Sequence, residues 1–455
     1  MTAGVSTARC LSRGSRAIAR VAWVLGAAAL LGAVAWTGAA SFAYDEVSVG
    51  AVQAWARTAG KVAGLLAGVM LMLQFGFSAR LKPLDRTFGL DRLLRAHRLF
   101  GILTGVLASL HPVLLYGSGL HVLGTLSWSL WPELLGAGAL TLLWVVLCTS
   151  LWAKFLELSY RGWWGVHQVV FIAAGVVVVH GLAIGSDLQR GWLPVLWLAI
   201  SAGYVALFVW VKFLKPLSLR RHRFRVVSVE AISPDVHVVE LTPPPGRGFS
   251  FLPGQCAFLT LHGQGLPAEE HPFTISSSPL DESGTVAFTI KASGDFTGRV
   301  GECAAGDWAT VDGPYGLFSH AVRAPVGPLV MIAGGIGITP MISMLRSMAA
   351  TGGRRPVTLI WGNREERDIV YRDELDGLVA AWPELTVHHV LSREPGWSGL
   401  TGHIDAAMLK LLLPPDRSAA RVFLCGPAEM MHAVGRSLRT LGVPRRRIHT
   451  ERFAL

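Results

Sequence analysis

Six long apolar stretches dominate the first half of this 455-residue chain and restrict what it can fold into. They lie near 21–43, 58–79, 94–117, 132–152, 163–184 and 192–213. Each approaches or exceeds the roughly 20 residues that a helix needs to cross the hydrocarbon core of a bilayer. Most of the tryptophans also fall before residue 211, as expected for spans that end at two membrane interfaces. The sequence therefore predicts a transmembrane domain at 21–215, preceded by a tail at 1–20.

Arginine and lysine gather beside alternate ends of these stretches, at 13–20, 80–95, 154–161 and 212–221. By the positive-inside rule, both termini and everything after the sixth stretch are expected in the cytoplasm of a cell whose plasma membrane holds the chain. The net charge of +11 is then a topology signal, and no nucleic-acid partner is expected. A cleaved signal peptide is the alternative for the first stretch, but its apolar run is long and favours a retained helix.

Four histidines lie inside two of the stretches: His97 and His111 in the third, His167 and His180 in the fifth. An ionisable side chain in a bilayer is costly and is kept mainly for function. Both helices run outward, so His97 and His167 are an inner pair, and His111 and His180 an outer pair. Spacings of 14 and 13 residues correspond to rises of about 21 Å and about 19.5 Å, enough depth for two haems. A lone histidine would more simply be a buried helix-bridging residue, but matched pairs favour bis-histidine haem ligation.

The two spacings differ in how well they fit an ideal helix. Fourteen residues return to within about 40° of the same face, whereas thirteen land about 140° away. The fifth helix is therefore expected to bend, with Gly175 and Gly181 as candidates, or its ring orientations must compensate. His121 lies outside the third span without a partner and is interpreted as a loop residue.

The five cysteines show no CxxC pair and no metal-ligand spacing. They give no sign of a disulfide framework or of a cysteine-ligated iron–sulfur cluster.

A short basic linker at 220–225 leads into a half with different patterning. Alternating segments such as RFRVVSVE and VAFTIKA predict strands at 218–322, and a βαβ pattern from 323 to 455 predicts a parallel sheet. The glycine-rich segment GGIGITP follows an apolar strand and opens a helix, which suits a pyrophosphate at the helix N-terminus. A tight strand-to-helix turn is the alternative. The residues concerned are Gly334, Gly335, Ile336, Gly337, Ile338, Thr339 and Pro340.

Several ordered motifs resemble the ferredoxin–NADP reductase superfamily. HPFTISSSP at 271–279 is similar to its flavin signature, GDFT at 294–297 to its FAD pyrophosphate turn, and LCGPAEMM at 424–431 to its CGP motif beside the nicotinamide. A near-terminal aromatic stacks on the flavin in that superfamily, which here is Phe453, although Ala454 and Leu455 follow it. The resemblance implies FAD contacts from His271, Pro272, Phe273, Thr274, Ile290, Lys291, Gly294, Phe296, Thr297 and Phe453.

The same resemblance implies a nicotinamide site bordered by Thr339 and by Cys425, Gly426 and Pro427. It also assigns Ser392 and Arg393 to the segment that distinguishes NADPH from NADH. An arginine suits the 2′-phosphate of NADPH, which favours NADPH over NADH, although a solvated loop arginine would look the same in sequence.

Both halves together resemble one family, the ferric reductase/NADPH oxidase superfamily. RAHRLFG…LASLHP and HQVVF…VVVHG match its haem-ligand segments, and a histidine-led flavin motif is usual there. The resemblance implies a multidomain membrane protein: a six-helix transmembrane haem bundle, an FAD-binding antiparallel β-barrel and an α/β nucleotide-binding domain with a parallel sheet. Electrons would pass from cytoplasmic NAD(P)H to FAD, then through two haem b groups to an external acceptor.

The sequence says less about the acceptor. The short outer loops hold no Cys or Asp/Glu cluster for a metal chelate, which tilts the expectation to O₂ giving superoxide. A ferric chelate or a periplasmic electron-accepting protein is the alternative, and a haem-based sensing protein is an alternative of another class. Arg57 opens the second span at its outer end, where it either pairs with an anion such as a haem propionate or snorkels to the interface.

Overall fold

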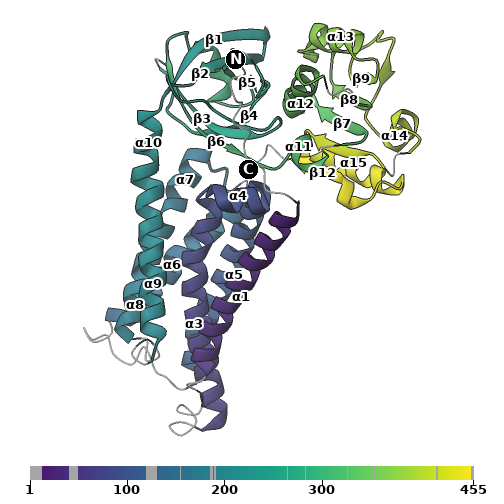
Figure 1. Ribbon diagram of the computed structural model, residues 1–455. Coiled ribbons are helices and arrows are strands. Elements are labelled where there is room, and N and C mark those ends of the chain that lie inside the picture. Colours follow the sequence, from purple (N-terminus) through teal and green to yellow (C-terminus); the bar gives the residue numbers. More distant parts are fainter. Residues whose placement is uncertain are drawn as a thin grey trace. The chain divides into compact units, whose positions relative to one another are not determined.

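The structure is a computed structural model (Figure 1), and it describes residues 13–39, 42, 50–118, 131–153, 155–184, 188, 191–263, 265–281, 283–324, 326–352, 355–416 and 419–451. Contacts between residues divide the chain into two compact units, one ending at Lys215 and the other beginning at Pro216. Phe453 and His121 lie outside the described residues.

The first unit is helical. Among the described residues, six helical segments are long and apolar enough to cross a membrane, as expected: Gly14–Trp36, Ala51–Ser78, Leu90–Gly117, Trp131–Leu151, Tyr160–Ile184 and Leu193–Arg221. The helices are α1 (Arg13–Ala39), α3 (Ala51–Ser78), α4 (Lys82–Phe88), α5 (Leu90–Gly117), α6 (Trp131–Leu151), α7 (Tyr160–Gln168), α8 (Val170–Ile184), α9 (Leu193–Val209) and α10 (Lys215–Arg221), with a π-helical turn at Trp210–Leu214.

Two breaks shape this unit. Gly89 separates α4 from α5 with a φ of 86°, a conformation that glycine adopts without the strain of a side chain. The fifth span is interrupted at Val169, between α7 and α8, and therefore between His167 and His180. The expected irregularity of this span is present, but Gly175 and Gly181 both lie inside α8 and do not cause it.

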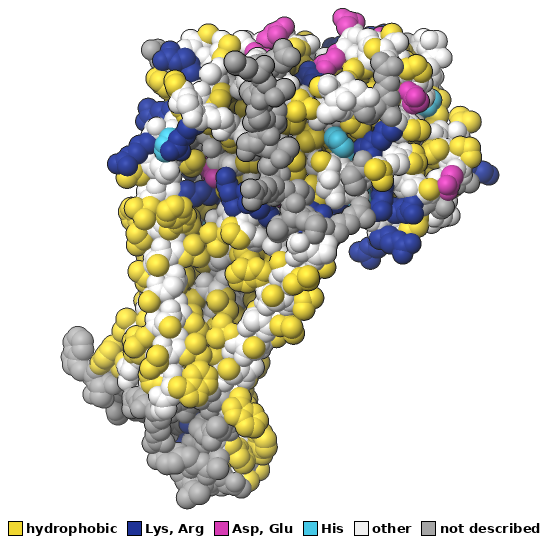
Figure 2. Space-filling view, in the orientation of Figure 1, with side chains coloured by type: hydrophobic (Ala, Val, Ile, Leu, Met, Phe, Trp, Pro, Cys, Tyr) yellow, Lys and Arg dark blue, Asp and Glu magenta, His cyan; other side chains and the backbone are white. Residues whose placement is uncertain are grey.

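Helix α3 is the central helix of the unit. Half of the residues in its apolar 18-residue segment are buried, a far larger share than in the other spans. It packs along α5, while α6 packs along α8. Trp197 of α9 lies so close to Gly68 of α3 that a β-carbon at Gly68 would be 2.5 Å from the indole ring. Many large apolar side chains of these helices are exposed, and they are prominent on the face seen in Figure 2, as in a protein surrounded by lipid.

The second unit begins with a six-stranded antiparallel sheet in the order β4-β3-β6-β1-β2-β5. A bridge between Ile275 and Phe288 links the end of β4 to β5, which brings the two edges of the sheet together. The alternating patterns predicted these strands, and their inward side chains form one core that includes Phe288 and Leu259. The strands are β1 (Phe224–Ser233), β2 (Val236–Thr242), β3 (Cys256–His262), β4 (His271–Thr274), β5 (Val286–Lys291) and β6 (Trp308–Tyr315).

A six-stranded parallel sheet follows, in the order β10-β9-β8-β7-β11-β12. Its strands are near-continuous apolar runs because helices cover both faces. The strands are β7 (Leu329–Gly334), β8 (Val357–Asn363), β9 (Leu385–Leu391), β10 (Leu400–Thr401), β11 (Arg421–Cys425) and β12 (Ile448–Glu451), and the helices are α11 (His320–Arg323), α12 (Thr339–Ala350), α13 (Arg372–Ala381), α14 (Ala406–Leu412) and α15 (Ala428–Thr440). The predicted fold class, with a helical membrane part, an antiparallel sheet and a parallel α/β part, is confirmed.

Candidate functional site

The helical unit brings together the two histidines of each predicted pair. The ring centres of His111 and His180 lie 6.3 Å apart, and those of His97 and His167 lie 6.1 Å apart. In both pairs one ring comes from α5 and the other from the α7–α8 segment. The break at Val169 lets histidines at a 13-residue spacing both face α5.

His111 and His180, the pair predicted to be the outer one, are both held by backbone carbonyls. Nδ1 of His111 lies 2.8 Å from the Gly60 carbonyl oxygen, and Nδ1 of His180 lies 2.7 Å from that of Pro132. A carbonyl oxygen only accepts hydrogen bonds, so Nδ1 carries the proton in each ring and donates it. The other ring nitrogen, Nε2, then keeps its lone pair, which is the form that a metal-binding histidine needs.

A glycine one helical turn after each carbonyl makes room for the outer rings. A β-carbon at Gly64 would lie 2.5 Å from Nδ1 of His111, and one at Gly136 would lie 2.6 Å from the His180 ring. Gly64 follows Gly60 by four residues, and Gly136 follows Pro132 by four. The missing side chain therefore lets the imidazole reach a carbonyl on the helix surface, and the sequence analysis did not identify either glycine.

The inner pair is held differently. Nδ1 of His97 donates to the Gln74 carbonyl oxygen at 3.0 Å, but Nδ1 of His167 faces the Ser150 hydroxyl at 3.3 Å. The Ser150 oxygen also accepts a hydrogen bond from the indole nitrogen of Trp163 at 3.2 Å. Three of the four rings thus donate to carbonyls, whereas His167 has a weaker hydroxyl partner.

These four rings fit a bis-histidine haem at each level. Metal–imidazole bonds are about 2 Å long, so a metal between two imidazoles separates their ring centres by about 6 Å, close to both observed separations. The acceptors on Nδ1 fix the tautomer that leaves Nε2 available. Among the described residues there is no group of three or more His, Cys, Asp or Glu side chains suited to a metal ion. A haem needs only two axial protein ligands.

Arg57 lies on α3 and is partly buried, and its buried Nε atom has no hydrogen-bond partner among the described residues. A buried donor without a partner is costly. The burial of Nε therefore favours the interpretation that Arg57 pairs with an anionic group over the interpretation that it only snorkels to the interface.

In the second unit, which begins at Pro216, the predicted flavin segment is strand β4. The ring of His271 stacks on Phe296 with centres 4.3 Å apart, and Phe273 lies 6.5 Å from the same ring. Pro272 faces Phe258 across the β3–β4 ladder. The buried Thr274 hydroxyl has no hydrogen-bond partner within the part of the chain that the structure describes, and such an orphaned polar atom suits a polar ring atom of a flavin.

The remaining predicted FAD residues lie nearby in the chain, but they differ in the contacts that they could make to a cofactor. The segment from Gly294 to Thr297 forms a tight turn, in which the Thr297 hydroxyl accepts from Ser293 N at 2.8 Å. Ile290 points into the barrel core with 1% of its surface exposed, so any contact to a cofactor would use its backbone. Lys291 pairs with Asp235 at 3.0 Å.

The glycine-rich turn and the CGP segment meet at the carboxyl ends of β7 and β11, which are neighbouring parallel strands. After β7 the chain continues to β8 on one side of this pair, and after β11 it continues to β12 on the other side. A β-carbon at Gly337 would lie 2.4 Å from the Cys425 carbonyl oxygen, and one at Gly426 would lie 3.0 Å from Gly334 N. The glycines thus allow two turns to pack backbone to backbone. Such a switch point is where open α/β sheets bind nucleotides.

The other residues of these turns are accounted for. Gly335 has a positive φ of 52°, and Ile336 accepts a hydrogen bond from the Thr339 hydroxyl at 3.1 Å. Ile338 and the Cys425 side chain are fully buried. Pro340 lies in the first turn of α12, and Pro427 precedes α15.

Ser392 and Arg393 follow β9 at the same edge of the sheet. Ser392 donates to the Asn363 carbonyl oxygen, and Arg393 N donates to that of Arg364 at 2.8 Å. Arg364 is therefore a second exposed cation beside Arg393, which the sequence analysis missed. Its position just after a parallel strand was the signal, because the carboxyl ends of adjacent parallel strands share one edge.

Comparisons with known proteins divide the chain in the same order. Residues 63–178 match the family described as ferric reductase like transmembrane component, 223–320 match the oxidoreductase FAD-binding domain, and 331–436 match the oxidoreductase NAD-binding domain.

The relatives are reductases. Ferredoxin–NADP reductase B of Sorangium cellulosum (strain So ce56) is 33% identical to this chain, in an alignment that covers 50% of this chain and 96% of that protein. The propane 2-monooxygenase reductase component of Rhodococcus jostii (strain RHA1) is 32% identical, in an alignment that covers 51% of this chain and 63% of that protein. The chain therefore spans less than two thirds of that relative. The CS-b5R domains of human Ncb5or match with 30% identity and a TM-score of 0.45, covering 50% of this chain and 68% of that one. The chain is therefore a multi-pass membrane NAD(P)H-dependent oxidoreductase of the ferric reductase/NADPH oxidase superfamily, with a reductase module of the ferredoxin–NADP reductase type.

Proposed function

We propose that this protein carries electrons from cytoplasmic NAD(P)H through FAD and two bis-histidine haems b to an acceptor on the opposite side of the membrane. The observation that carries the proposal is the pair of histidine rings at each level of the bundle, with ring centres 6.1 Å and 6.3 Å apart. The flavin accepts the two electrons of a hydride, and each haem passes one at a time, which is the chemistry these groups supply. The proposed domains are 1–20, 21–215, 218–322 and 323–455.

The protein's own residues orient these groups. Backbone carbonyls of Gly60, Pro132 and Gln74 fix the tautomers of three axial histidines. In the reductase unit, His271 and Phe296 make an aromatic stack, and the Thr274 hydroxyl offers a buried polar contact for the flavin ring. The positive charges that flank the spans support a cytoplasmic location for both termini and for the reductase unit.

We propose O₂ as the acceptor, with superoxide as the product. His97, His111, His167 and His180 would hold the two haems, and with two histidines on each iron O₂ would take its electron without binding to the metal. Arg57, with its buried and unpartnered Nε, is the residue proposed to hold an anionic haem edge or to attract a small anion at that end of the bundle. A ferric chelate is the second candidate acceptor, supported by the match of residues 63–178 to a ferric reductase family. A periplasmic electron-accepting protein is a third.

The acceptor test uses the purified full chain in detergent with NADPH as donor. Oxygen consumption that generates superoxide, measured by a superoxide-dismutase-sensitive dye, is expected in air. Rapid anaerobic reduction of a ferric chelate without superoxide formation in air would overturn the oxidase proposal. His180→Ala supplies the control: transfer to either external acceptor should fail, while NADPH still reduces the flavin.

A further inference from the structure

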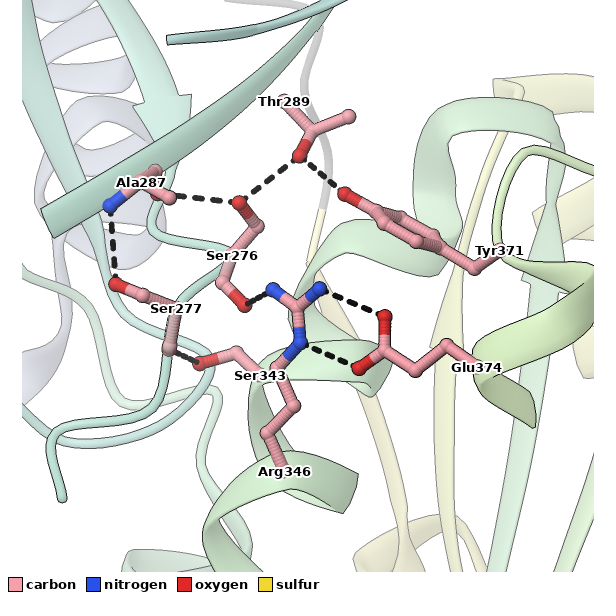
Figure 3. Close-up of polar contacts among 8 residues, drawn as sticks. All are labelled: Ser276, Ser277, Ala287, Thr289, Ser343, Arg346, Tyr371 and Glu374. Atoms are coloured by element: carbon pink, nitrogen blue, oxygen red, sulfur yellow. Dashed lines mark hydrogen bonds and ion pairs between the residues drawn. The ribbon is translucent and has the colours of Figure 1, made fainter. Parts of the chain in front are cut away.

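A polar seam joins the antiparallel-sheet half of the reductase unit to its parallel-sheet half (Figure 3). Three of its residues follow or belong to strands β4 and β5, and four belong to α12 or to the start of α13. The seam comprises Ser276, Ser277, Thr289, Ser343, Arg346, Tyr371 and Glu374.

Arg346 lies at the centre of the seam. Its Nη1 donates to the Ser276 carbonyl oxygen at 2.8 Å across the boundary, while Nε and Nη2 bind the two Glu374 oxygens at 2.6 Å and 2.7 Å. The guanidinium also lies over the Tyr371 ring, 5.2 Å from its centre. Burial alone would lower the pKa of Arg346, but the Glu374 carboxylate outweighs it and raises that pKa. The bidentate pair therefore holds the guanidinium in one orientation, with its third edge directed at Ser276.

Three further hydrogen bonds cross the same boundary. The Ser343 hydroxyl donates to the Ser277 carbonyl oxygen at 2.8 Å and accepts from Gly254 N at 3.3 Å. The Tyr371 and Thr289 hydroxyls share a short hydrogen bond, and Thr289 donates in turn to the Ser276 hydroxyl at 2.9 Å. Side chains of the parallel-sheet half thus bind two consecutive residues after β4, Ser276 and Ser277.

Each side of the seam is close in the chain to a segment that holds a cofactor. Ser276 is two residues beyond Thr274 of the flavin segment. Arg346 is seven residues beyond Thr339 on α12, the helix that starts at the glycine-rich turn, which is about 10 Å along a rigid helix. A displacement at the seam would therefore move the nucleotide turn relative to the flavin segment.

We propose that Arg346, held by Glu374, is a positioning residue for hydride transfer from NAD(P)H to the flavin. In that step the C–H bond of the dihydronicotinamide breaks, and its hydrogen and both electrons pass together to the flavin. The rate depends steeply on how closely donor and acceptor are held, and a misplacement of about 1 Å costs about 100-fold in comparable reactions. This inference concerns only the NAD(P)H–flavin reaction and is independent of the haems and of the external acceptor.

The test is stopped-flow reduction of the flavin in the full-length protein under anaerobic conditions, with NADPH and with NADPH deuterated at the transferred position. Arg346→Lys keeps the charge but loses the planar fork. We expect flavin reduction at saturating NADPH to slow by about 10- to 100-fold, with FAD content and the NADPH concentration for half-saturation unchanged. The isotope effect should become more temperature-dependent, a change that a loss of stability alone would not produce.

Arg372→Lys is the matched control. Arg372 also pairs with a glutamate, Glu366, and lies over an aromatic ring, Trp397, but all three belong to the nucleotide-binding half. This variant should reduce its flavin within about twofold of the wild-type rate, as expected for a partly exposed ion pair that does not itself cross the boundary. An equal slowing in both variants would overturn the proposal, because the effect would then not be specific to the seam.

A second variant decides the matter if Arg346→Lys loses FAD. Tyr371→Phe removes one hydroxyl and so the link to Thr289, while keeping the ring under the guanidinium. We expect a several-fold slower flavin reduction in this variant. A wild-type rate and a wild-type isotope effect in Tyr371→Phe would then overturn the proposal.

Discussion

The imidazole ring of His180 lies against the bare backbone of Gly136, so that a β-carbon there would be 2.6 Å from the ring. The contact places Nδ1 of His180 within 2.7 Å of the Pro132 carbonyl oxygen, one helical turn earlier. Gly64 and Gly60 repeat the arrangement for His111. The outer pair of rings is thus seated in two matching notches on α6 and α3.

Because a β-carbon at Gly136 would overlap the His180 ring, we expect Gly136→Ala to displace His180 and to remove the proposed outer haem. The control is Gly138→Ala on the same helix, where a β-carbon meets nothing within 4 Å. Haem content measured by the pyridine haemochrome method should fall from about two to about one per chain in Gly136→Ala and stay near two in Gly138→Ala. Full haem content in Gly136→Ala would show that the ring does not need this notch.

Ser150 predicts a difference between the two haems. A histidine that donates from Nδ1 to a good acceptor is a more basic metal ligand, which favours ferric iron and lowers the reduction potential. Ser150→Ala removes the acceptor of His167, so the midpoint potential of the inner haem should rise while that of the outer haem stays constant. Spectroelectrochemical titration separates the two.

The control for that titration is Ser109→Ala. Its hydroxyl accepts from the Trp144 indole at 3.0 Å, as Ser150 does from Trp163, but it donates to the Gly105 carbonyl oxygen. Both midpoints should therefore be unaffected. If Ser150→Ala also leaves both midpoints in place, the hydroxyl is not the partner of the inner axial ligand.

Arg393 predicts the coenzyme preference. It lies at the carboxyl edge of the sheet beside Arg364, and a hydrogen bond to a charged group contributes about 1.5–3 kcal/mol. Arg393→Ala should raise KM for NADPH by at least about tenfold while leaving KM for NADH unchanged. Arg367→Ala, a highly exposed arginine paired with Glu365, serves as the control and should change neither. Equal effects on both coenzymes would exclude a 2′-phosphate contact.

His320 predicts a pH dependence of stability. Burial, with a smaller effect from Arg355, lowers the pKa of His320 from 6.5 to about 4. Between these values the unfolded chain binds a proton that the folded chain does not, so stability is full above pH 6.5 and falls as the pH drops toward 4. His320 contributes about 1–3 kcal/mol to this loss.

Urea unfolding of the purified protein, followed by release of FAD fluorescence, measures that loss at several pH values. His320→Gln should flatten the slope relative to wild type. His388 and His389 also have lowered pKa values through burial and contribute with the same sign, so the difference between the two proteins isolates His320. An unchanged slope would show that His320 takes up its proton at the same pH in the folded and unfolded states.

The sequence predicted the order of the parts because apolar length, alternation and βαβ patterning are local signals. It also paired the histidines correctly by level, because loop charges gave each helix a direction. It did not locate the break at Val169, where no glycine or proline marks the position. Nor did it identify Gly64 and Gly136, because a glycine in an apolar span has many roles until a ring from another helix lies against it. The Arg346 seam was equally invisible, since its residues are scattered over about 100 positions of the chain and meet only in the folded unit.

The central claim is that each level of the bundle binds one haem between two histidines. The most direct measurement is haem stoichiometry and axial ligation in the purified full chain, by pyridine haemochrome assay and low-temperature electron paramagnetic resonance. The account predicts about two low-spin, bis-histidine haems b per chain. One haem per chain, none, or a high-spin iron with an open axial position would contradict it.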